Sequence, residues 1–368
     1  MKETVVQKWF ALVLGAAMLM ALTGCNKNGT SSSAKLTTVR MVSPTALASL
    51  DLCWLYAGDG LGYFEQEGIK VEMIECTDGS DPKMLASGQA DFGGFSPSVG
   101  LTSIAAGATN LKAVVNTVSC NMFGFAYNKD FGVDSFEKIQ GKNIGAITDT
   151  FDVIFNPILA AAGVDTSTVK YISYGSAEYE ALARGQVPVM ATWLSEYYMC
   201  QGMGYDWGYL SGNDVLPQIA NSLWVNTDFL DKNPELVKKF VKAVQKSMYV
   251  CYAAPEVVAD IVLARYPSIE ITWEGAIGSI KGNVSGMLGI DPEVAKANIE
   301  SKNIGFYDMA VVKQTIQNLV DGGALAEALD ADTYYTNDFV TKDLDYDAID
   351  ADLAAYQFRS KIYKNSHK

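Results

Sequence analysis

Histidine is nearly absent from this chain: the only one among its 368 residues is His367, next to the last residue. Catalytic triads of the Ser-His-Asp type need a histidine that packing holds in place, and a chain end holds a side chain poorly. Zinc sites built on histidine are excluded for the same reason. We therefore expect no enzyme activity, no metal site and no cofactor.

Cysteine and basic residues are also sparse. Apart from Cys25 the number of cysteines is odd, and they form no C-x-x-C pair: they are Cys53, Cys76, Cys120, Cys200 and Cys251. They give no disulfide framework, and we expect most of them to be buried as small apolar side chains. With 28 Lys and Arg against 42 Asp and Glu, the net charge is −14, which argues against a nucleic-acid partner.

One long apolar run, WFALVLGAAMLMALTGC, lies at the start of the chain. It is too short to be a comfortable membrane span and ends in small residues, as a signal peptide does. Its last four residues, LTGC ending at Cys25, resemble the lipobox of bacterial lipoproteins. That resemblance implies a signal peptide over 1–24, acylation of Cys25, a flexible tether over 25–36, and a location on the extracytoplasmic face of the bacterial cell membrane. An ordinary secretory signal or a single anchor helix is the alternative.

A five-residue phrase occurs twice, as LASGQ at 85–89 and LARGQ at 182–186, with its glycines 97 residues apart. In both places an apolar stretch of helical period ends at the glycine and a strand-like stretch follows. Strand and helix patterns alternate around both phrases, which predicts two α/β lobes, each with a mostly parallel sheet flanked by helices. The boundaries that follow are lobe 1 over 37–127 and 227–368, lobe 2 over 128–226, and crossing strands near 125–128 and 224–226.

Four motifs occur in a fixed order: GYFEQEGIKV at 62–71, LASGQADFG at 85–93, IQGKNIG at 139–145 and FLDKNPELV at 229–237. Together they resemble the signatures of the extracytoplasmic solute-binding proteins for nitrate, sulfonates, taurine and thiamine precursors, the NMT1-like family. The resemblance implies a two-lobed periplasmic-binding-protein-like fold of type II, with a ligand cleft between the lobes. It also implies a monomer that delivers a small molecule to the transmembrane subunits of an ABC permease with a cytoplasmic ATPase. Pro188 stands where the family usually has an aspartate, which leaves the local turn open.

The ligand of such a protein is expected at the carboxyl ends of the parallel strands, where helix N-termini also point. In lobe 1 the candidates that follow the predicted strands are Pro44, Thr45, Trp54, Gly79, Phe95, Ser96, Ser98 and Asn121. In lobe 2 the candidates are Asp149, Thr150, Phe151, Trp193, Glu196 and Tyr197. Two of them have a structural alternative, because Ser96 also suits a helix cap and Trp54 also suits the core.

Glu196 is the most specific of these candidates. In the thiamine-precursor branch of the family a glutamate at a similar place pairs with an aminopyrimidine, and here it stands beside Trp193 and Tyr197. The resemblance therefore implies a planar, heteroaromatic ligand with N–H donors, bound by lobe closure and more weakly in acid. The alternative for Glu196 is a solvated glutamate that interacts favourably with the helix dipole. The alternatives for the protein are a binding protein for nitrate or an alkylsulfonate, and an enzyme like the fungal pyrimidine synthases of the same fold, which consume a histidine in their site.

Overall fold

The computed structural model describes residues 35–367, and the described residues from Leu36 onward form one compact unit. The expected signal peptide over 1–24 and the lipidation site Cys25 lie outside the described residues, as does most of the expected tether.

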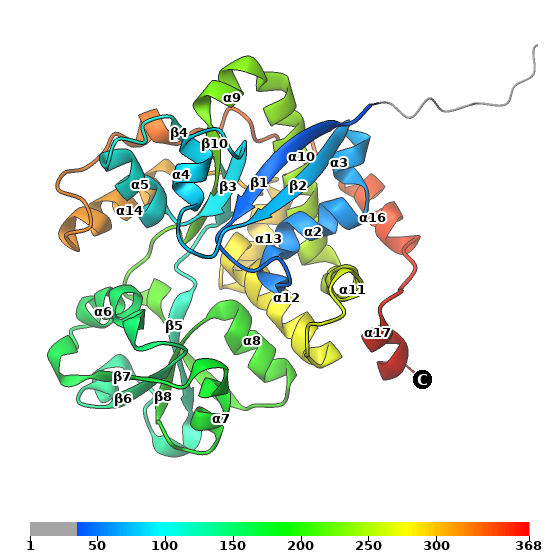
Figure 1. The fold of residues 1–368 in the computed structure, drawn as a ribbon. Coiled ribbons are helices and arrows are strands. Elements are labelled where there is room, and N and C mark those ends of the chain that lie inside the picture. The colour runs from blue at the N-terminus through cyan, green and yellow to red at the C-terminus, as the bar shows by residue number, and fades with distance from the viewer. Residues whose placement is uncertain (1–34, 368) are drawn as a thin grey trace, which may run out of the picture. The chain divides into compact units, whose positions relative to one another are not determined.

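Within the described part, the strands form two five-stranded sheets (Figure 1). In the first sheet the strand order is β2-β1-β3-β10-β4, and β10 runs antiparallel to both of its neighbours. The strands are β1 (Thr37–Ser43), β2 (Ile69–Glu75), β3 (Phe92–Phe95), β4 (Leu111–Val118) and β10 (Asn221–Asn226). Their apolar side chains are largely buried, as parallel strands covered by helices require.

The second sheet repeats this order as β7-β6-β8-β5-β9, again with an antiparallel strand, β5, in fourth place. Its strands are β5 (Phe123–Asn128), β6 (Asn143–Ala146), β7 (Lys170–Ser173), β8 (Val189–Trp193) and β9 (Trp207–Ser211). The shared order confirms the prediction of two alike, mostly parallel sheets in an α/β fold.

The chain passes between the sheets at 119–122 and at 212–220, directly before β5 and β10. The segments expected to cross, 125–128 and 224–226, instead lie inside these two strands. That expectation was wrong because both strands are hydrogen-bonded to a neighbour on each side, so their backbone groups are committed to a sheet. The lobe boundaries drawn from the sequence stay a prediction.

Short helices join the parallel strands of both sheets. Those of the first sheet are η1 (Leu50–Leu52), α2 (Cys53–Gly60), α3 (Tyr63–Gln66), α4 (Asp81–Ala86) and α5 (Pro97–Ala105). Those of the second sheet are η2 (Lys129–Phe131), η3 (Phe136–Ile139), η4 (Asp149–Phe151), α6 (Asp152–Ala161), η5 (Thr166–Thr168), η6 (Gly175–Ala177), α7 (Glu178–Ala183), α8 (Leu194–Gly202) and η7 (Gly212–Asp214). The helices that come next after a parallel strand, such as α4 after β2, α5 after β3 and α8 after β8, begin at the carboxyl edge of their sheet.

The repeated phrase ends α4 and α7 in the same way. Leu85 and Leu182 are fully buried, and Gly88 and Gly185 follow with φ of 71° and 69°. Glycine takes these left-handed angles without strain, so each helix stops and the chain turns toward β3 or β8. The phrase therefore marks equivalent places in two repeats, as predicted.

The C-terminal part is helical and packs on the first sheet. Helix α10 begins at Pro234 as expected, and its Phe240 stacks on Phe92 of β3 with ring centroids 4.2 Å apart. The helices are α9 (Thr227–Lys232), α10 (Pro234–Ala253), α11 (Pro255–Arg265), α12 (Trp273–Leu288), α13 (Pro292–Glu300), α14 (Met309–Asp321), α15 (Ala331–Tyr334), α16 (Tyr346–Ala354) and α17 (Lys361–Ser366). Among the described residues no single helix is long and apolar enough to cross a membrane; α10 and α11 pass that test only when combined across a bend of 112°.

Helix α8 of the second sheet lies against α12, which belongs to the core of the first sheet. A Cβ atom on Gly278 of α12 would lie 2.2 Å from the carbonyl oxygen of Tyr198, and one on Gly202 of α8 would lie 2.2 Å from that of Glu274. Both distances are well below van der Waals contact, so the two helix backbones touch directly. The sheets are therefore joined by a helix contact as well as by the two crossings.

Candidate functional site

The carboxyl edges of the two sheets meet at a hydrogen bond. Asp51 follows β1 of the first sheet, and Ser195 follows β8 of the second. The Ser195 hydroxyl donates to Asp51 Oδ1 at 2.9 Å. Burial raises the pKa of Asp51 above its ordinary value, while the hydrogen bonds from Ser195 and Ser49 act in the opposite direction. An acidic group thus lies where the segments after two parallel strands come together.

Glu196 stands in the first turn of α8 and is held by two hydroxyl groups. Tyr179 donates to its Oε1 at 2.6 Å, and Thr192 donates to its Oε2 at 2.8 Å. Burial nevertheless raises the pKa of Glu196 to about 8, with smaller contributions from the nearby carboxylates of Glu178 and Asp51. Glu196 therefore differs from a solvated glutamate, because it changes its charge near neutral pH.

Glu178, the first residue of α7, is a second buried carboxylate beside Glu196. Only 1% of its surface is exposed, and its Oε2 atom has no hydrogen-bond partner. Burial raises the pKa of Glu178, while a hydrogen bond from its own backbone N–H and, to a smaller extent, the hydroxyl of Tyr179 counteract this rise. Tyr179 therefore stands between two carboxylates with one proton to donate, which leaves an acceptor in this cluster unused.

Two aromatic rings lie at the same edge of the second sheet. Trp193 ends β8 and Phe151 ends η4, and their ring centroids are 6.5 Å apart in an edge-on arrangement. Both rings are partly exposed, and Phe151 also stacks on Phe155 of α6. The pair offers an apolar surface, and Trp193 lies three residues before Glu196.

The other candidates of the second sheet are placed differently. Asp149 and Thr150 are exposed in η4. Tyr197 is engaged within its own sheet, because its hydroxyl donates to the carbonyl of Trp207 at 3.1 Å and its ring stacks on Tyr209 at 4.8 Å.

Three candidates of the first sheet are buried. Trp54 is 5% exposed and packs in the core with its ring over Gly94, as its structural alternative predicted. Phe95 is 2% exposed and stacks on Trp224. Asn121 is fully buried at the first crossing and donates to a backbone carbonyl, so it stabilises the connection between the sheets.

The remaining candidates of the first sheet lie after strand ends. Thr45 and Gly79 are exposed and Pro44 is half-buried. The hydroxyls of Ser96 and Ser98 are 2.9 Å apart, and Ser96 also accepts from the backbone N–H of Val99. Ser96 is therefore the helix cap that its alternative predicted.

Sequence reasoning missed Asp51 and Glu178. A signal for Glu178 was present, because it lies 97 residues after Asp81, the same interval that separates the two phrase glycines. Asp81 is the first residue of α4, is 2% exposed, and likewise has a carboxylate oxygen, Oδ2, without a partner. Among residues 35–367 no group of three or more His, Cys, Asp or Glu side chains is arranged to hold a metal ion.

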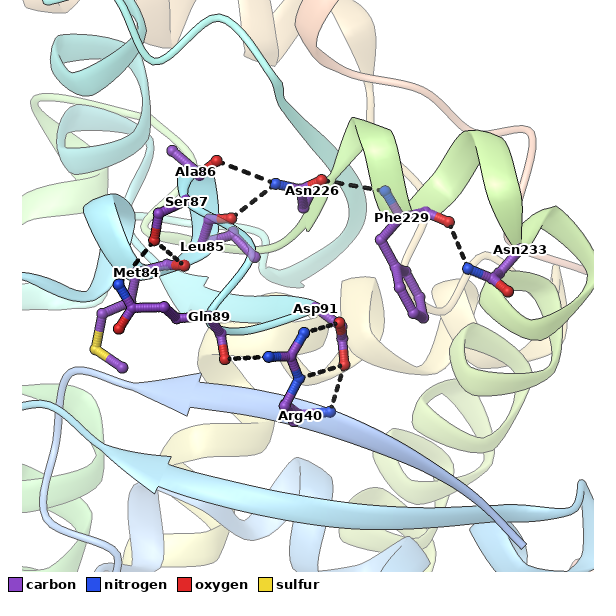
Figure 2. A network of polar contacts seen from close by, with 10 residues as sticks. All are labelled: Arg40, Met84, Leu85, Ala86, Ser87, Gln89, Asp91, Asn226, Phe229 and Asn233. Carbon is purple, nitrogen blue, oxygen red and sulfur yellow. Dashed lines mark hydrogen bonds and ion pairs between the residues drawn. The ribbon is translucent and has the colours of Figure 1, made fainter.

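A cavity of about 280 Å³ lies away from these carboxyl ends, beside the residues that precede β3. Figure 2 shows Arg40 of β1 reaching both oxygens of Asp91 and the carbonyl of Gln89, at 3.2, 2.6 and 2.8 Å. Asn226 spans the same region, since its side chain donates to the Leu85 carbonyl at 2.8 Å. Asp91, the aspartate of the motif at 85–93, thus serves to fix β1 against β3.

A family model described as NMT1/THI5 like matches residues 50–257, more than half of the chain. The chain belongs to the NMT1/THI5-like family. This confirms the resemblance read from the four motifs.

Two curated relatives of this chain have names that indicate different activities, one an enzyme and the other a binding protein. The chain is 27% identical over 218 residues to 4-amino-5-hydroxymethyl-2-methylpyrimidine phosphate synthase of Aspergillus parasiticus, which covers 55% of the chain and only 63% of the synthase. It is 22% identical over 368 residues to the riboflavin-binding protein RibY of Chloroflexus aurantiacus, covering 91% of the chain and 99% of RibY.

A solved structure shares the fold. The periplasmic nitrate-binding protein NrtA of Synechocystis PCC 6803 aligns with a TM-score of 0.59 and 14% identity over 88% of this chain and 90% of NrtA. The fold of this NMT1/THI5-like chain is therefore the periplasmic-binding-protein fold, as expected.

The expectation that the chain is no enzyme is overturned by its relatives. Several of them are named as pyrimidine phosphate synthases, so membership of the NMT1/THI5-like family does not separate binding proteins from enzymes. The histidine argument was also too strong, because His367 is held by packing: its ring stacks on Tyr363 at 4.2 Å and meets Trp273 edge-on at 6.0 Å.

Proposed function

We propose that this chain is the solute-binding component of an ABC importer. In this proposal a lipid on Cys25 anchors it to the outer face of the cell membrane, and it acts as a monomer. Closure of its two lobes captures a small planar or heteroaromatic nutrient, which it delivers to the transmembrane subunits of a permease with a cytoplasmic ATPase. The fold and the similarity to RibY over nearly the whole chain support this proposal.

The observation that carries the ligand class is Glu196 with its two hydroxyl partners at the carboxyl end of β8. A carboxylate fixed by Tyr179 and Thr192 presents its remaining lone pairs in a set direction, as recognition of N–H donors needs. The rings of Trp193 and Phe151 supply an apolar surface on which a flat ligand can stack. Glu196 and its two hydroxyl partners offer no positive charge to an anion such as nitrate or an alkylsulfonate, which disfavours that alternative.

Native mass spectrometry of the purified protein tests the proposal, followed by a thermal-shift screen of planar heteroaromatic compounds. We expect one ligand per chain, and a rise in Tm because the ligand binds the folded state alone. Trp193→Ala and Glu196→Gln should each weaken binding at least tenfold, whereas Tyr252→Ala, at a partly exposed ring on α10, should leave it unchanged. Wild-type affinity in both site variants would refute this site.

A second candidate function rests on the synthase relatives. The chain would then be an enzyme that builds a pyrimidine on the same scaffold, as their name indicates for those proteins. Mass analysis after incubation with candidate precursors separates the two: recovery of an unaltered compound supports binding, and a new pyrimidine product supports the synthase.

A further inference from the structure

The carboxyl edges of both sheets carry charge of one sign. We define the edge segments as residues 44–52, 76–81, 147–152, 174–178 and 194–196, which follow β1, β2, β6, β7 and β8. Every charged residue in these segments is Asp or Glu, although the chain has 28 Lys and Arg in all. The crossings at 119–122 and 212–220 add no basic residue.

Four of these acids are shielded from solvent enough for burial to raise their pKa values. Burial raises the pKa of Asp51, Asp81, Glu178 and Glu196, and no Lys or Arg counteracts the rise for any of the four. The charges that do act on them are other carboxylates: Asp78 acts on Asp81, while Glu178 and Asp51 act on Glu196. The edge thus holds two buried acids, Asp81 and Glu178, and two half-buried ones, Asp51 and Glu196, without a cation to balance them.

Two of the buried acids also have an unused oxygen atom. Asp81 is 2% exposed and Glu178 is 1% exposed, and Asp81 Oδ2 and Glu178 Oε2 have no hydrogen-bond partner. They are the first residues of α4 and α7, the equivalent helices of the two repeats. A buried acceptor without a donor destabilises a folded protein, so its presence at the same place in both repeats calls for a partner from outside the chain.

Glu178 connects the unused oxygen to the cluster already described. Glu178 directly precedes Tyr179, whose hydroxyl donates to Glu196 Oε1, and its carboxylate is one of the charges that raise the pKa of Glu196. The one phenolic proton of Tyr179 goes to Glu196, which leaves Glu178 short of a donor. A positively charged group with N–H donors would supply both the missing hydrogen bond and the missing charge.

We propose that the ligand is a cation, a planar compound bearing an amine, amidine or ring-nitrogen charge, held by Glu178 and Glu196 at the second sheet, with Asp81 as the matching acceptor of the first sheet. This inference rests on the proposed binding function and narrows its ligand class. It separates this chain from binding proteins for anions, since a nitrate or sulfonate would enter an edge of uncompensated carboxylates.

The test compares ligands that differ in charge but share a ring. One matched set is 1-methylnicotinamide as cation, nicotinamide as neutral compound and nicotinate as anion, within a larger panel of planar heteroaromatic compounds sorted by charge. Thermal shift ranks the panel and calorimetry measures the best compounds. We expect cations to give the largest rise in Tm and to bind at least tenfold more tightly than their neutral partners. If a neutral or anionic compound ranks first, the proposal of a cationic ligand is wrong, whereas the proposed binding function still holds.

Isosteric variants show whether the two buried acids serve a ligand. Glu178→Gln and Asp81→Asn should raise the Tm of the empty protein at neutral pH, because each removes an uncompensated buried charge. Each should also weaken binding of the cationic ligand at least tenfold. The controls Glu180→Gln, on α7 like Glu178, and Glu72→Gln, on the neighbouring strand β2, remove exposed charges and should change neither quantity. Variants that lower the Tm and keep full affinity would mean that the acids serve the fold alone. If no compound binds and the purified protein carries no cargo, the proposed binding function itself fails.

Discussion

Gly282 of α12 faces the carbonyl oxygen of Leu194 at the start of α8, so closely that a Cβ atom on the glycine would lie 2.4 Å from that oxygen. Leu194 follows β8 of the second sheet directly, whereas α12 packs in the core of the first. The start of the helix that carries Glu196 is therefore positioned by the first sheet as well as by its own.

Gly282→Ala should therefore disturb the contact between the sheets. The added methyl group forces the backbones of α8 and α12 apart, and overpacking of this kind costs about 1–3 kcal/mol. Chemical denaturation measures the loss, and Lys281→Ala at the exposed neighbouring position is the control. A stability equal to that of the control would mean that the two helices separate without cost.

Ser195→Ala should destabilise the protein by about 1–3 kcal/mol, because it takes a hydrogen bond from the half-buried carboxylate of Asp51. A double-mutant cycle with Asp51→Ala isolates the bond, and we expect the two substitutions to be clearly non-additive. Ser301→Ala, at an exposed serine, controls for loss of a hydroxyl. Additive effects would show that the bond contributes nothing to the join between the sheets.

The repeated phrase allowed the sequence to predict the order of strands and helices in both sheets. Its glycines mark helix ends by a local rule that needs no tertiary contact, since Gly88 and Gly185 take left-handed angles. Pro234 and Ser96 mark helix starts by equally local rules. Features of this kind can be read from a single chain.

The candidate site was less predictable, because it depends on which face of an element a side chain occupies. Trp54 and Phe95 follow the strand-end rule, yet both turn into the core. Asp51 escaped notice because its partner Ser195 is 144 residues away, and no local pattern shows such a contact. The crossing segments were misplaced into β5 and β10 for the same reason, because the strands that pair with β5 and β10 come from distant parts of the chain.

Asp91→Ala should lower stability and leave ligand binding unchanged. Asp91 is largely buried and accepts from the guanidinium and the backbone N–H of Arg40, so its removal frees several donors at once. Arg40 is 38% exposed and can turn to water, which limits the loss to about 1–3 kcal/mol. Glu180→Ala, which breaks the exposed pair with Arg184, should cost far less. Loss of binding in a folded Asp91→Ala protein would instead place the cavity beside it in the ligand site.

The stability of the empty protein should fall as the pH rises from about 5 to 8. The pKa of Glu196 is about 8 in the folded state against an ordinary value of 4.5, so in this window the folded chain keeps a proton that the unfolded chain has lost. Below the window both states are protonated, and above it both are charged, so the curve flattens at each end. Glu196→Gln should remove much of the slope. An identical slope in that variant would assign the titration to another group.

Binding should respond to pH in the opposite sense. A protonated Glu196 carries no charge and has one acceptor site fewer, so a cationic ligand must displace its proton. The affinity should therefore fall by up to tenfold per pH unit as the pH drops below about 8. The weakening expected in acid thus begins above neutral pH, because burial raises the pKa of this carboxyl. A permanently charged probe such as 1-methylnicotinamide, or the cargo once identified, keeps the ligand's own titration out of the measurement. Calorimetry in buffers of different ionisation heat should show proton release on binding at pH 7, and none in Glu196→Gln. Binding that is independent of pH in the wild-type protein would mean that Glu196 stays protonated and does not carry the ligand's charge.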